Sequence, residues 1–205
     1  MDIITGKIYS VLKEHGFRGI KEKMKKKFHQ RYYVYRSDLN PQGVKYETFH
    51  FVLMDEMLLQ EMYIEFKGEM ADEKYRTLME RIRPESTDRC YAVLDDESRI
   101  YGHYCISLGD NYEPVIDMVI SANEEELYLF DDYTFIKRRG RKAQHYSILK
   151  RQEIAMELGY KTAKSIILSG NTPSEKAYTS AGFQRIKKIE SFRLLNHKRK
   201  WIRNI

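Results

Sequence analysis

The stretch from residue 125 to residue 183 constrains the fold of this 205-residue chain more than any other part. It opens with aromatic and aliphatic residues at 126–135, which predict a strand. A basic turn with one glycine follows at 137–144, and apolar residues at helical spacing then lead to Gly159, which is suited to end a helix. A short apolar run at 165–168 predicts a second strand. Strand, helix and strand in this order indicate a crossover unit with parallel strands.

The basic turn between the first strand and the helix has the properties of an anion site. The N–H groups at a helix start lack intrahelical partners and lie at the positive end of the helix dipole. Arg138, Arg139, Arg141 and Lys142 add full positive charges at this point. We therefore expect a phosphate-bearing ligand at the turn.

Two patterns in this stretch resemble the GNAT superfamily of N-acetyltransferases. Arg139-Gly140-Arg141-Lys142-Ala143-Gln144 aligns with the pyrophosphate loop of that family, although Lys142 and Gln144 stand where the family usually has small residues. Downstream, Asn171, Tyr178 and Gly182-Phe183 match the family signature N-x6-Y-x3-G-F. The resemblance covers residues 47–195.

The resemblance implies a mixed α/β fold with a central, mostly antiparallel sheet flanked by helices. It also implies acetyl-CoA as the cofactor and transfer of its acetyl group to a primary amine. The backbone at Tyr133, Thr134 and Phe135 would then pair with the pantetheine arm of the cofactor. The residues that would surround its pyrophosphate are Arg138, Arg139, Gly140, Arg141, Lys142 and Ala143.

Tyr178 and Asn171 also acquire roles from the resemblance. Tyr178 matches the tyrosine that protonates the departing thiolate, and a packed aromatic at the end of a helix is the alternative interpretation. Asn171 matches a residue that contacts the pantetheine arm or caps the next helix. Because Pro173-Ser174-Glu175 has the composition of a helix start, the cap is an equal alternative.

The general base that deprotonates the amine is the least defined group of the site. Asp131 and Asp132 are neighbours on the strand before the turn, and alternation along a strand places them on opposite faces. At most one of them therefore faces the acceptor, and we rank Asp132 first. Glu126 and His103 are further candidates, and bulk water is the alternative if the acceptor amine has a low pKa.

The chain outside this stretch divides into three parts by composition. We expect an N-terminal basic extension at 1–45, an acyltransferase domain at 46–196 and a basic tail at 197–205. The extension contains a lysine-rich helical stretch at 18–30, which is either a solvated helix face or a surface for an anionic partner. Within the chain we expect strands at 32–36, 46–54, 90–95 and 99–108, helices at 3–15, 55–66 and 72–83, and a closing strand or hairpin at 184–196.

Composition narrows the class of protein. A formal net charge of +6 and a pI near 9.1 suggest an anionic partner such as coenzyme A, a phosphorylated acceptor or nucleic acid. No apolar run is long enough to span a membrane, and the N-terminus lacks the features of a signal peptide. Cys90 and Cys105 are interpreted as reduced, small core residues, and no metal-ligand spacing is present. We therefore expect a cytoplasmic protein without a metal centre.

The function that we expect is acetyl-CoA-dependent N-acetylation of a small molecule with a primary amine. The lysine-rich stretch favours a phosphorylated or nucleotide-linked acceptor such as an amino sugar, and a homodimer is compatible with the sequence. One alternative is a catalytically inactive GNAT-like binding module, which Lys142 and Gln144 support. The other is a nucleic-acid-binding protein, which is less favoured because the basic residues are spread over both termini and the turn without a recognition-helix pattern.

Overall fold

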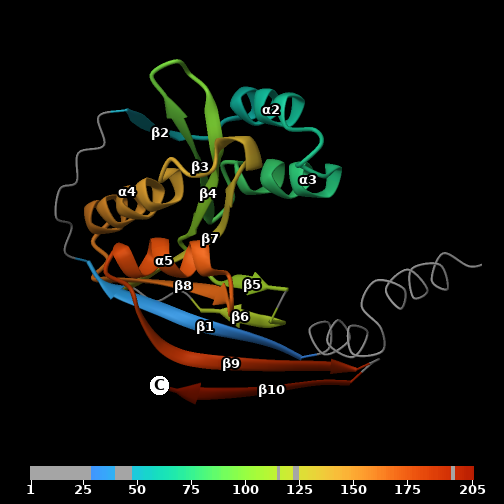
Figure 1. The fold of residues 1–205 in the computed structure, drawn as a ribbon, viewed down its shortest axis with the longest axis vertical. Coiled ribbons are helices and arrows are strands. Elements are labelled where there is room, and N and C mark those ends of the chain that lie inside the picture. The colour runs from blue at the N-terminus through green and yellow to red at the C-terminus, as the bar shows by residue number, and fades with distance from the viewer. Residues whose placement is uncertain (1–28, 40–47, 115, 122–124, 195–196) are drawn as a thin grey trace, which may run out of the picture.

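The computed structural model describes residues 29–39, 48–114, 116–121, 125–194 and 197–205, as Figure 1 shows. The strands are β1 (His29–Asp38), β2 (Phe49–Leu53), β3 (Asp88–Asp95), β4 (Ile100–Ser107), β5 (Asn111–Glu113), β6 (Met118–Ile120), β7 (Glu126–Thr134), β8 (Thr162–Leu168), β9 (Gln184–Leu194) and β10 (His197–Asn204). The helices in this part of the chain are α2 (Glu56–Glu65), α3 (Asp72–Arg81), α4 (Ala143–Glu157) and α5 (Thr172–Ser180), with a 3-10 turn, η1, at Ile136–Arg138.

Eight of the strands form one sheet in the order β10-β9-β1-β8-β7-β4-β3-β2, and β5 pairs with β6 separately. Neighbouring strands of the large sheet are antiparallel except β7 and β8, which are parallel and joined through α4. This arrangement confirms the mixed, mostly antiparallel sheet flanked by helices. The helical extension that we expected at the N-terminus falls on residues 1–28, outside the described residues.

The parallel strands β7 and β8 separate soon after they begin. Their pairing joins residues 126–128 of β7 to residues 162–164 of β8, and no pairing follows beyond these positions. Backbone groups at the open ends of the two strands are therefore available to a ligand. The short apolar run at 165–168, where we expected the second strand, is the unpaired end of β8 on this side.

A β-bulge bends β7 where it runs beside β4. Cys105 pairs with Phe130 and His103 with Tyr133, so three steps along β7 match two along β4. Asp131 lies in the bulge and has a φ of 51°. Aspartate adopts this left-handed conformation more readily than most residues do. The bulge lies at the open end of the strand pair.

Helices cover both faces of the sheet. On one face Leu59 and Met62 of α2 and its C-cap residue, Phe66, are buried. On the other face Ile148 and Ala155 of α4 pack in a second apolar cluster. None of the helices in the described part of the chain is long and apolar enough to cross a membrane.

Strand β1 corrects the expected domain boundary at residue 45. Residues 29–38 lie inside the large sheet, where β1 pairs antiparallel with β8 on one side and β9 on the other. The tail at 197–205 forms β10, which pairs with β9 along its length. The partners of β1 are far away in sequence, a relation that local composition does not reveal, whereas β10 follows its partner β9 directly.

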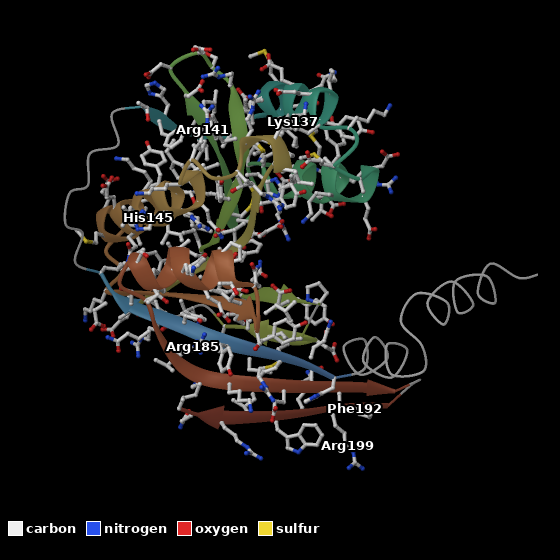
Figure 2. The ribbon with its side chains drawn as sticks, in the orientation of Figure 1. Lys137, Arg141, His145, Arg185, Phe192 and Arg199 are labelled. Atoms are coloured by element: carbon white, nitrogen blue, oxygen red, sulfur yellow. A yellow bond between two sulfur atoms is a disulfide. The ribbon has the colours of Figure 1, made fainter. Side chains whose placement is uncertain are left out.

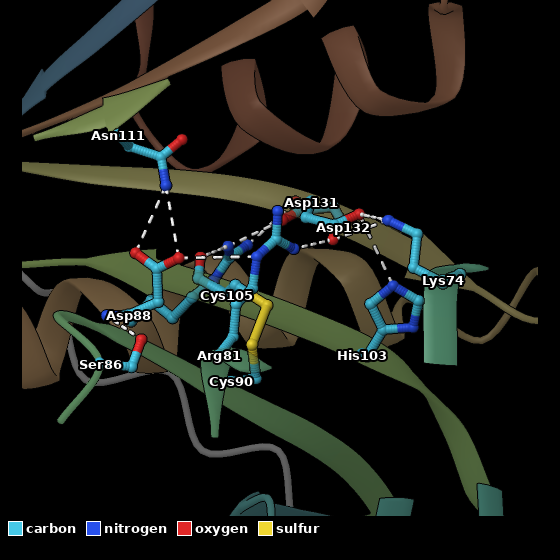
Figure 3. The surroundings of a disulfide bond; sticks show 11 residues. Lys74, Arg81, Ser86, Asp88, Cys90, His103, Cys105, Asn111, Asp131 and Asp132 are labelled. Carbon is cyan, nitrogen blue, oxygen red and sulfur yellow. Dashed lines mark hydrogen bonds and ion pairs between the residues drawn. A yellow bond between two sulfur atoms is a disulfide. The ribbon is translucent and has the colours of Figure 1, made fainter. Parts of the chain in front are cut away.

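The two cysteines correct a second expectation. Cys90 of β3 and Cys105 of β4 are direct cross-strand partners, and they form a disulfide (Figure 3). Both residues are buried, as expected, but they are not reduced. A count of two cysteines could not show that they lie opposite each other in the sheet.

Candidate active site

A cavity of about 700 Å³ lies at the open ends of β7 and β8, bounded by the first residues of α4 and α5. Its size suits a cofactor or a drug-sized ligand. Nine of the residues that we selected from the sequence line it: Asp132, Tyr133, Thr134, Arg138, Arg139, Gly140, Lys142, Ala143 and Asn171. The structure therefore brings together residues from one strand, one turn and two helix starts around a single space.

Two of the predicted cofactor residues lie elsewhere. Phe135 is fully buried and stacks on Phe66, with 3.6 Å between the ring centroids. Arg141 donates a hydrogen bond to the Tyr101 hydroxyl at 3.1 Å and does not line the cavity, and Figure 2 shows it well away from His145 of α4. These two side chains contact other parts of the protein, Phe66 and Tyr101, and do not contribute to the cavity wall.

The turn leads into α4 through two residues with left-handed backbone. Gly140 has a φ of 83° and Lys142, the residue before the helix, has a φ of 65°. The side chains of Arg138 and Arg139 are held by the protein, since Arg138 pairs with Glu65 at 2.9 Å and Arg139 donates to the Thr134 carbonyl at 3.0 Å. Among the described residues Lys142 has no side-chain partner, so its ammonium is the uncommitted cation of the turn.

Asp132 is the centre of a buried hydrogen-bond network. Both its oxygens accept from the Arg151 guanidinium of α4, at 2.7 and 2.9 Å. Its Oδ2 also accepts from the Tyr178 hydroxyl at 2.9 Å and from Gln144 at 3.3 Å. Because both oxygens are already engaged, the arrangement suits Asp132 to orient its neighbours rather than to take up a proton from an amine.

Arg151 anchors this network to the sheet. Its side chain is fully buried, and Nη1 also donates to the Cys105 carbonyl at 3.0 Å. Sequence reasoning missed this residue. The available signal was its place between Ile148 and Ala155, where a charged residue interrupts the buried stripe of α4.

Tyr178 is also fully buried, at the end of α5. Burial, followed by the negative charge of Asp132, raises the pKa of its hydroxyl well above the ordinary tyrosine value. The hydroxyl therefore keeps its proton at neutral pH. It borders a smaller cavity of about 120 Å³, not the larger one.

The smaller cavity lies on the other side of Asp132. Asp132, Gln144, Asn171 and Ser174 line both cavities, so the two spaces meet at these residues. Its remaining wall comes from residues of β7 and β8, together with Glu113 of β5 and Tyr178 of α5. A ligand in the larger cavity could therefore reach Tyr178 through this junction.

Asn171 occupies the N-cap position of α5 without a capping hydrogen bond from its side chain. Its side chain thus does not make the cap that we weighed as one alternative. Since Asn171 borders both cavities, contact with a ligand is the interpretation that remains.

Asp131 points to the opposite face of the sheet from Asp132, as strand alternation predicted. Lys74 donates to both of its oxygens at 2.8 Å, and Arg81 forms a close ion pair with it, as Figure 3 shows. The buried His103 ring lies 3.7 Å from the carboxylate. Burial alone would raise the pKa of Asp131, but His103, Lys74 and Arg81 outweigh it and hold that pKa well below its usual range.

The other candidate bases lie away from the cavities. Glu126 pairs with Lys164 at 2.7 Å and with Arg36 at 3.0 Å, at the closed end of the β7–β8 pair. His103 packs against Tyr133 and Phe135 inside the sheet. Neither residue lines a cavity described above.

Comparison with solved structures identifies the fold. A glucosamine N-acetyltransferase region of a fungal multidomain β-N-acetylglucosaminidase superposes with a TM-score of 0.58 at 12% identity, over 86% of this chain and 23% of that one. A protein from Novosphingobium aromaticivorans, assigned to the GNAT acetyltransferases, gives 0.54 at 16% over 79% and 62%. A tandem GNAT protein from the clavulanic acid biosynthesis pathway gives 0.53 at 11% over 85% and 53%.

The chain spans less than two thirds of the length of each of these three proteins. Comparison with protein-family models and with curated protein sequences gives no match. At these identities the similarity establishes a shared fold, and it leaves the chemistry to be argued from the residues of the site.

Proposed function

We propose that this chain, which has the fold of the GNAT superfamily, is an acetyl-CoA-dependent N-acetyltransferase that acts on a primary amine. The observation that carries the proposal is the cavity at the open ends of β7 and β8. It combines the ends of two strands that no longer pair with each other, a helix start and a basic turn, and these features suit a long ligand with a phosphorylated end.

Each part of the larger cavity has a role in this proposal. The residues of the turn and the first N–H groups of α4 hold the pyrophosphate, and the Lys142 ammonium adds charge where the family usually has a small residue. The backbone at Tyr133 and Thr134 holds the pantetheine arm. The bound cofactor supplies an acetyl group that is activated as a thioester.

The Arg151–Asp132–Tyr178 network serves the transfer step in this proposal. The amine nitrogen forms a bond to the acetyl carbon and the carbon–sulfur bond breaks. Tyr178 donates its proton to the departing sulfur, which requires its hydroxyl to turn from Asp132 toward the cavity junction. The amine loses its proton to solvent, because Asp132 is committed to Arg151 and Asp131 to Lys74 and Arg81.

The acceptor that we propose is a small molecule with a primary amine. The expectation of a phosphorylated or nucleotide-linked amino sugar rests on the lysine-rich stretch at 18–30, and most of that stretch lies outside the described residues. A panel of amines is therefore the way to identify the acceptor. The panel should include a polyamine, an amino sugar, its phosphate and a nucleotide-linked amino sugar.

The test is turnover by the full-length chain with acetyl-CoA and each amine of the panel. We expect release of the free thiol of coenzyme A together with an acetylated product for at least one class of amine. Tyr178 does not line the larger cavity, which favours a binding module without catalysis as the second candidate. Binding of acetyl-CoA without turnover for any amine would establish that candidate and contradict the enzyme.

A further inference from the structure

The basic residues of the chain are unevenly distributed. Strands β9 and β10 carry eight lysine and arginine residues and one acidic residue, Glu190. Residues 29–183 are acidic by contrast, with 20 lysines and arginines against 26 aspartates and glutamates. The positive net charge of the chain therefore does not come from the part that contains both cavities.

Strand β1, which follows the lysine-rich stretch in sequence, lies beside the basic C-terminal strand β9. Strand β1 begins at His29, which pairs with Phe192 of β9, and β9 pairs with β10. Directly before His29 the chain carries five lysines between residues 21 and 27. The first residues of β1 therefore lie beside the basic strand β9.

Cross-strand partners of an antiparallel sheet project from the same face, so the register of β1, β9 and β10 defines a three-strand surface. We name it the basic face. Its nine residues are His29, Arg31, Tyr33, Lys188, Glu190, Phe192, Arg199, Trp201 and Arg203. None of them lines either cavity, so the basic face is separate from the candidate active site.

The charges on the basic face are largely uncompensated. Glu190 is its single acid, and it is shared by Arg31 at 3.1 Å and Lys188 at 3.0 Å. Arg199 and Arg203 are exposed, and no described residue pairs with their guanidinium groups. The face therefore attracts anions.

Aromatic rings lie between these cations. Trp201 is 45% exposed and stands between Arg199 and Arg203 on β10. Phe192 is partly exposed beside Arg199, and Figure 2 shows the two side chains next to each other at one end of the hairpin. The third ring, Tyr33, is covered by the guanidinium of Arg185 at 4.4 Å from its centroid. Trp201 and Phe192 are thus the rings open to a ligand.

We propose that the basic face binds single-stranded nucleic acid. Arg199 and Arg203 stand four residues, or about 14 Å, apart on β10 with Trp201 between them, so the cations suit a phosphate backbone and the ring suits an unpaired base. A duplex hides the faces of its bases, so the aromatic residues select a single strand. This inference is independent of the proposed acetyl transfer.

Other occupants fit the basic face less well. A second copy of the chain would bring two strongly basic hairpins together, and like charges repel. A membrane surface requires apolar residues gathered on one face, whereas Trp201 and the exposed Ile202 lie on opposite faces of β10. An acidic protein would use the cations but not the rings.

The experiment is fluorescence anisotropy of a labelled 20-nucleotide oligo-dT, titrated with the full-length protein. A duplex of the same length is the comparison. We expect tighter binding of the single strand and loss of affinity with salt. If four side chains, Arg31, Lys188, Arg199 and Arg203, each meet a phosphate, raising the salt from 50 to 200 mM should weaken binding by up to about 50-fold.

Two variants test the surface itself. Arg199→Glu with Arg203→Glu should weaken binding at least tenfold and reduce the salt dependence. Trp201→Ala should weaken it about fivefold or more with little change in salt dependence, because stacking is not ionic. The matched control reverses two exposed cations elsewhere, Lys67→Glu with Arg76→Glu, and should change affinity less than twofold.

Several results would overturn the proposal. Equal affinity for duplex and single strand, or no effect of Trp201→Ala, would show that the rings take no part. An equal loss in the Lys67 and Arg76 control would indicate general attraction of charge. Binding to phosphatidylserine vesicles without binding to oligo-dT would assign the face to a membrane surface. As a control, each variant should unfold at the same temperature as the wild type, which shows that a loss of binding is not a loss of the fold.

Discussion

At the scale of single residues, Asp132 is the group on which the candidate site depends. It joins the sheet to α4 through Arg151 and to α5 through Tyr178, at the point where the two cavities meet. A carboxylate held by a buried guanidinium fixes the positions of its neighbours. We therefore propose that Asp132 positions its neighbours, and that Tyr178 is the residue that exchanges a proton with the substrate.

Replacing Tyr178 by phenylalanine tests this division of roles. The ring stays in its packing position between Tyr35 and Phe183, so the fold should persist. We expect kcat to fall by about 100-fold or more, with little change in the KM for acetyl-CoA, because only the proton donor is lost. Steady-state kinetics measures both constants. A kcat within twofold of the wild type would remove Tyr178 from the mechanism.

Asp131 should make the protein sensitive to acid. Its folded pKa lies below the unfolded value of about 3.9, so its stabilising effect is complete above the unfolded value and is lost progressively as the pH falls from there through the lower folded pKa. Asn tolerates the same left-handed backbone, so Asp131→Asn removes only the charge. At pH 7 the free energy of unfolding of this variant should be about 1–3 kcal/mol lower than that of the wild type, because Lys74 and Arg81 lose their partner.

Denaturant titrations at pH 7, 5, 4 and 3 measure this effect. The difference between wild type and Asp131→Asn should shrink as the pH falls below about 5 and be smallest at pH 3. Asp131 would have no stabilising role if the two proteins showed the same stability at every pH.

At the level of elements, β1 is the strand that connects the two parts of the large sheet. It separates β8 from β9, and both pairings extend over seven or more residues. Without β1 the sheet would be divided, and the buried Tyr32, Val34 and Tyr35 would be missing from the core.

A fragment of residues 46–205 should therefore not fold cooperatively. This fragment starts at the boundary that the sequence suggested, and it lacks β1. A fragment of residues 29–205 retains every described strand and is the matched control. Thermal unfolding followed by circular dichroism compares the two. Cooperative unfolding of the 46–205 fragment at the temperature of the control would show that β1 is dispensable.

The Cys90–Cys105 disulfide closes a loop of 15 residues between β3 and β4. Closing a loop of this length stabilises a protein by about 3 kcal/mol in the chain-entropy view. We expect the unfolding temperature to drop by about 6–12 °C under reducing conditions. The Cys90→Ala/Cys105→Ala variant should lack this response. An equal drop in that variant would show that the reductant acts elsewhere.

Elements defined by local patterns were predictable, and elements defined by distant partners were not. The crossover unit of β7, α4 and β8 could be predicted because strand, turn and helix signals follow one another along 126–168. The place of β1 in the sheet depends on pairing with the distant strands β8 and β9, which composition cannot show. The bulge at Asp131 likewise arises from the register between β4 and β7.

At the scale of the whole molecule, the candidate active site and the basic face occupy different parts of one sheet. The cavities lie where β7 and β8 separate, within the acidic part of the chain, and the basic face lies on β1, β9 and β10. The net charge of +6 indicated an anionic partner but could not locate it. Most of the residues that line the larger cavity could be selected from the sequence, because many of them follow one another along a single turn.

The rest of the site could not be selected in this way. Arg151 and Gln144 reach Asp132 from α4, and Lys74 and Arg81 reach Asp131 from α3, so their roles arise from packing between elements. Phe135 and Arg141 lie next to cavity residues in sequence, yet the bend of the chain turns both away from the cavity.

The measurement that tests the proposed function most directly is thermal unfolding of the full-length protein with acetyl-CoA, coenzyme A or ATP. A ligand that binds the folded state at about 100 times its Kd adds about 2.7 kcal/mol, which for a chain of this size raises the unfolding temperature by about 5–10 °C. We predict this rise with acetyl-CoA and coenzyme A and a smaller one or none with ATP. No rise with millimolar acetyl-CoA would contradict the assignment of the larger cavity to this cofactor.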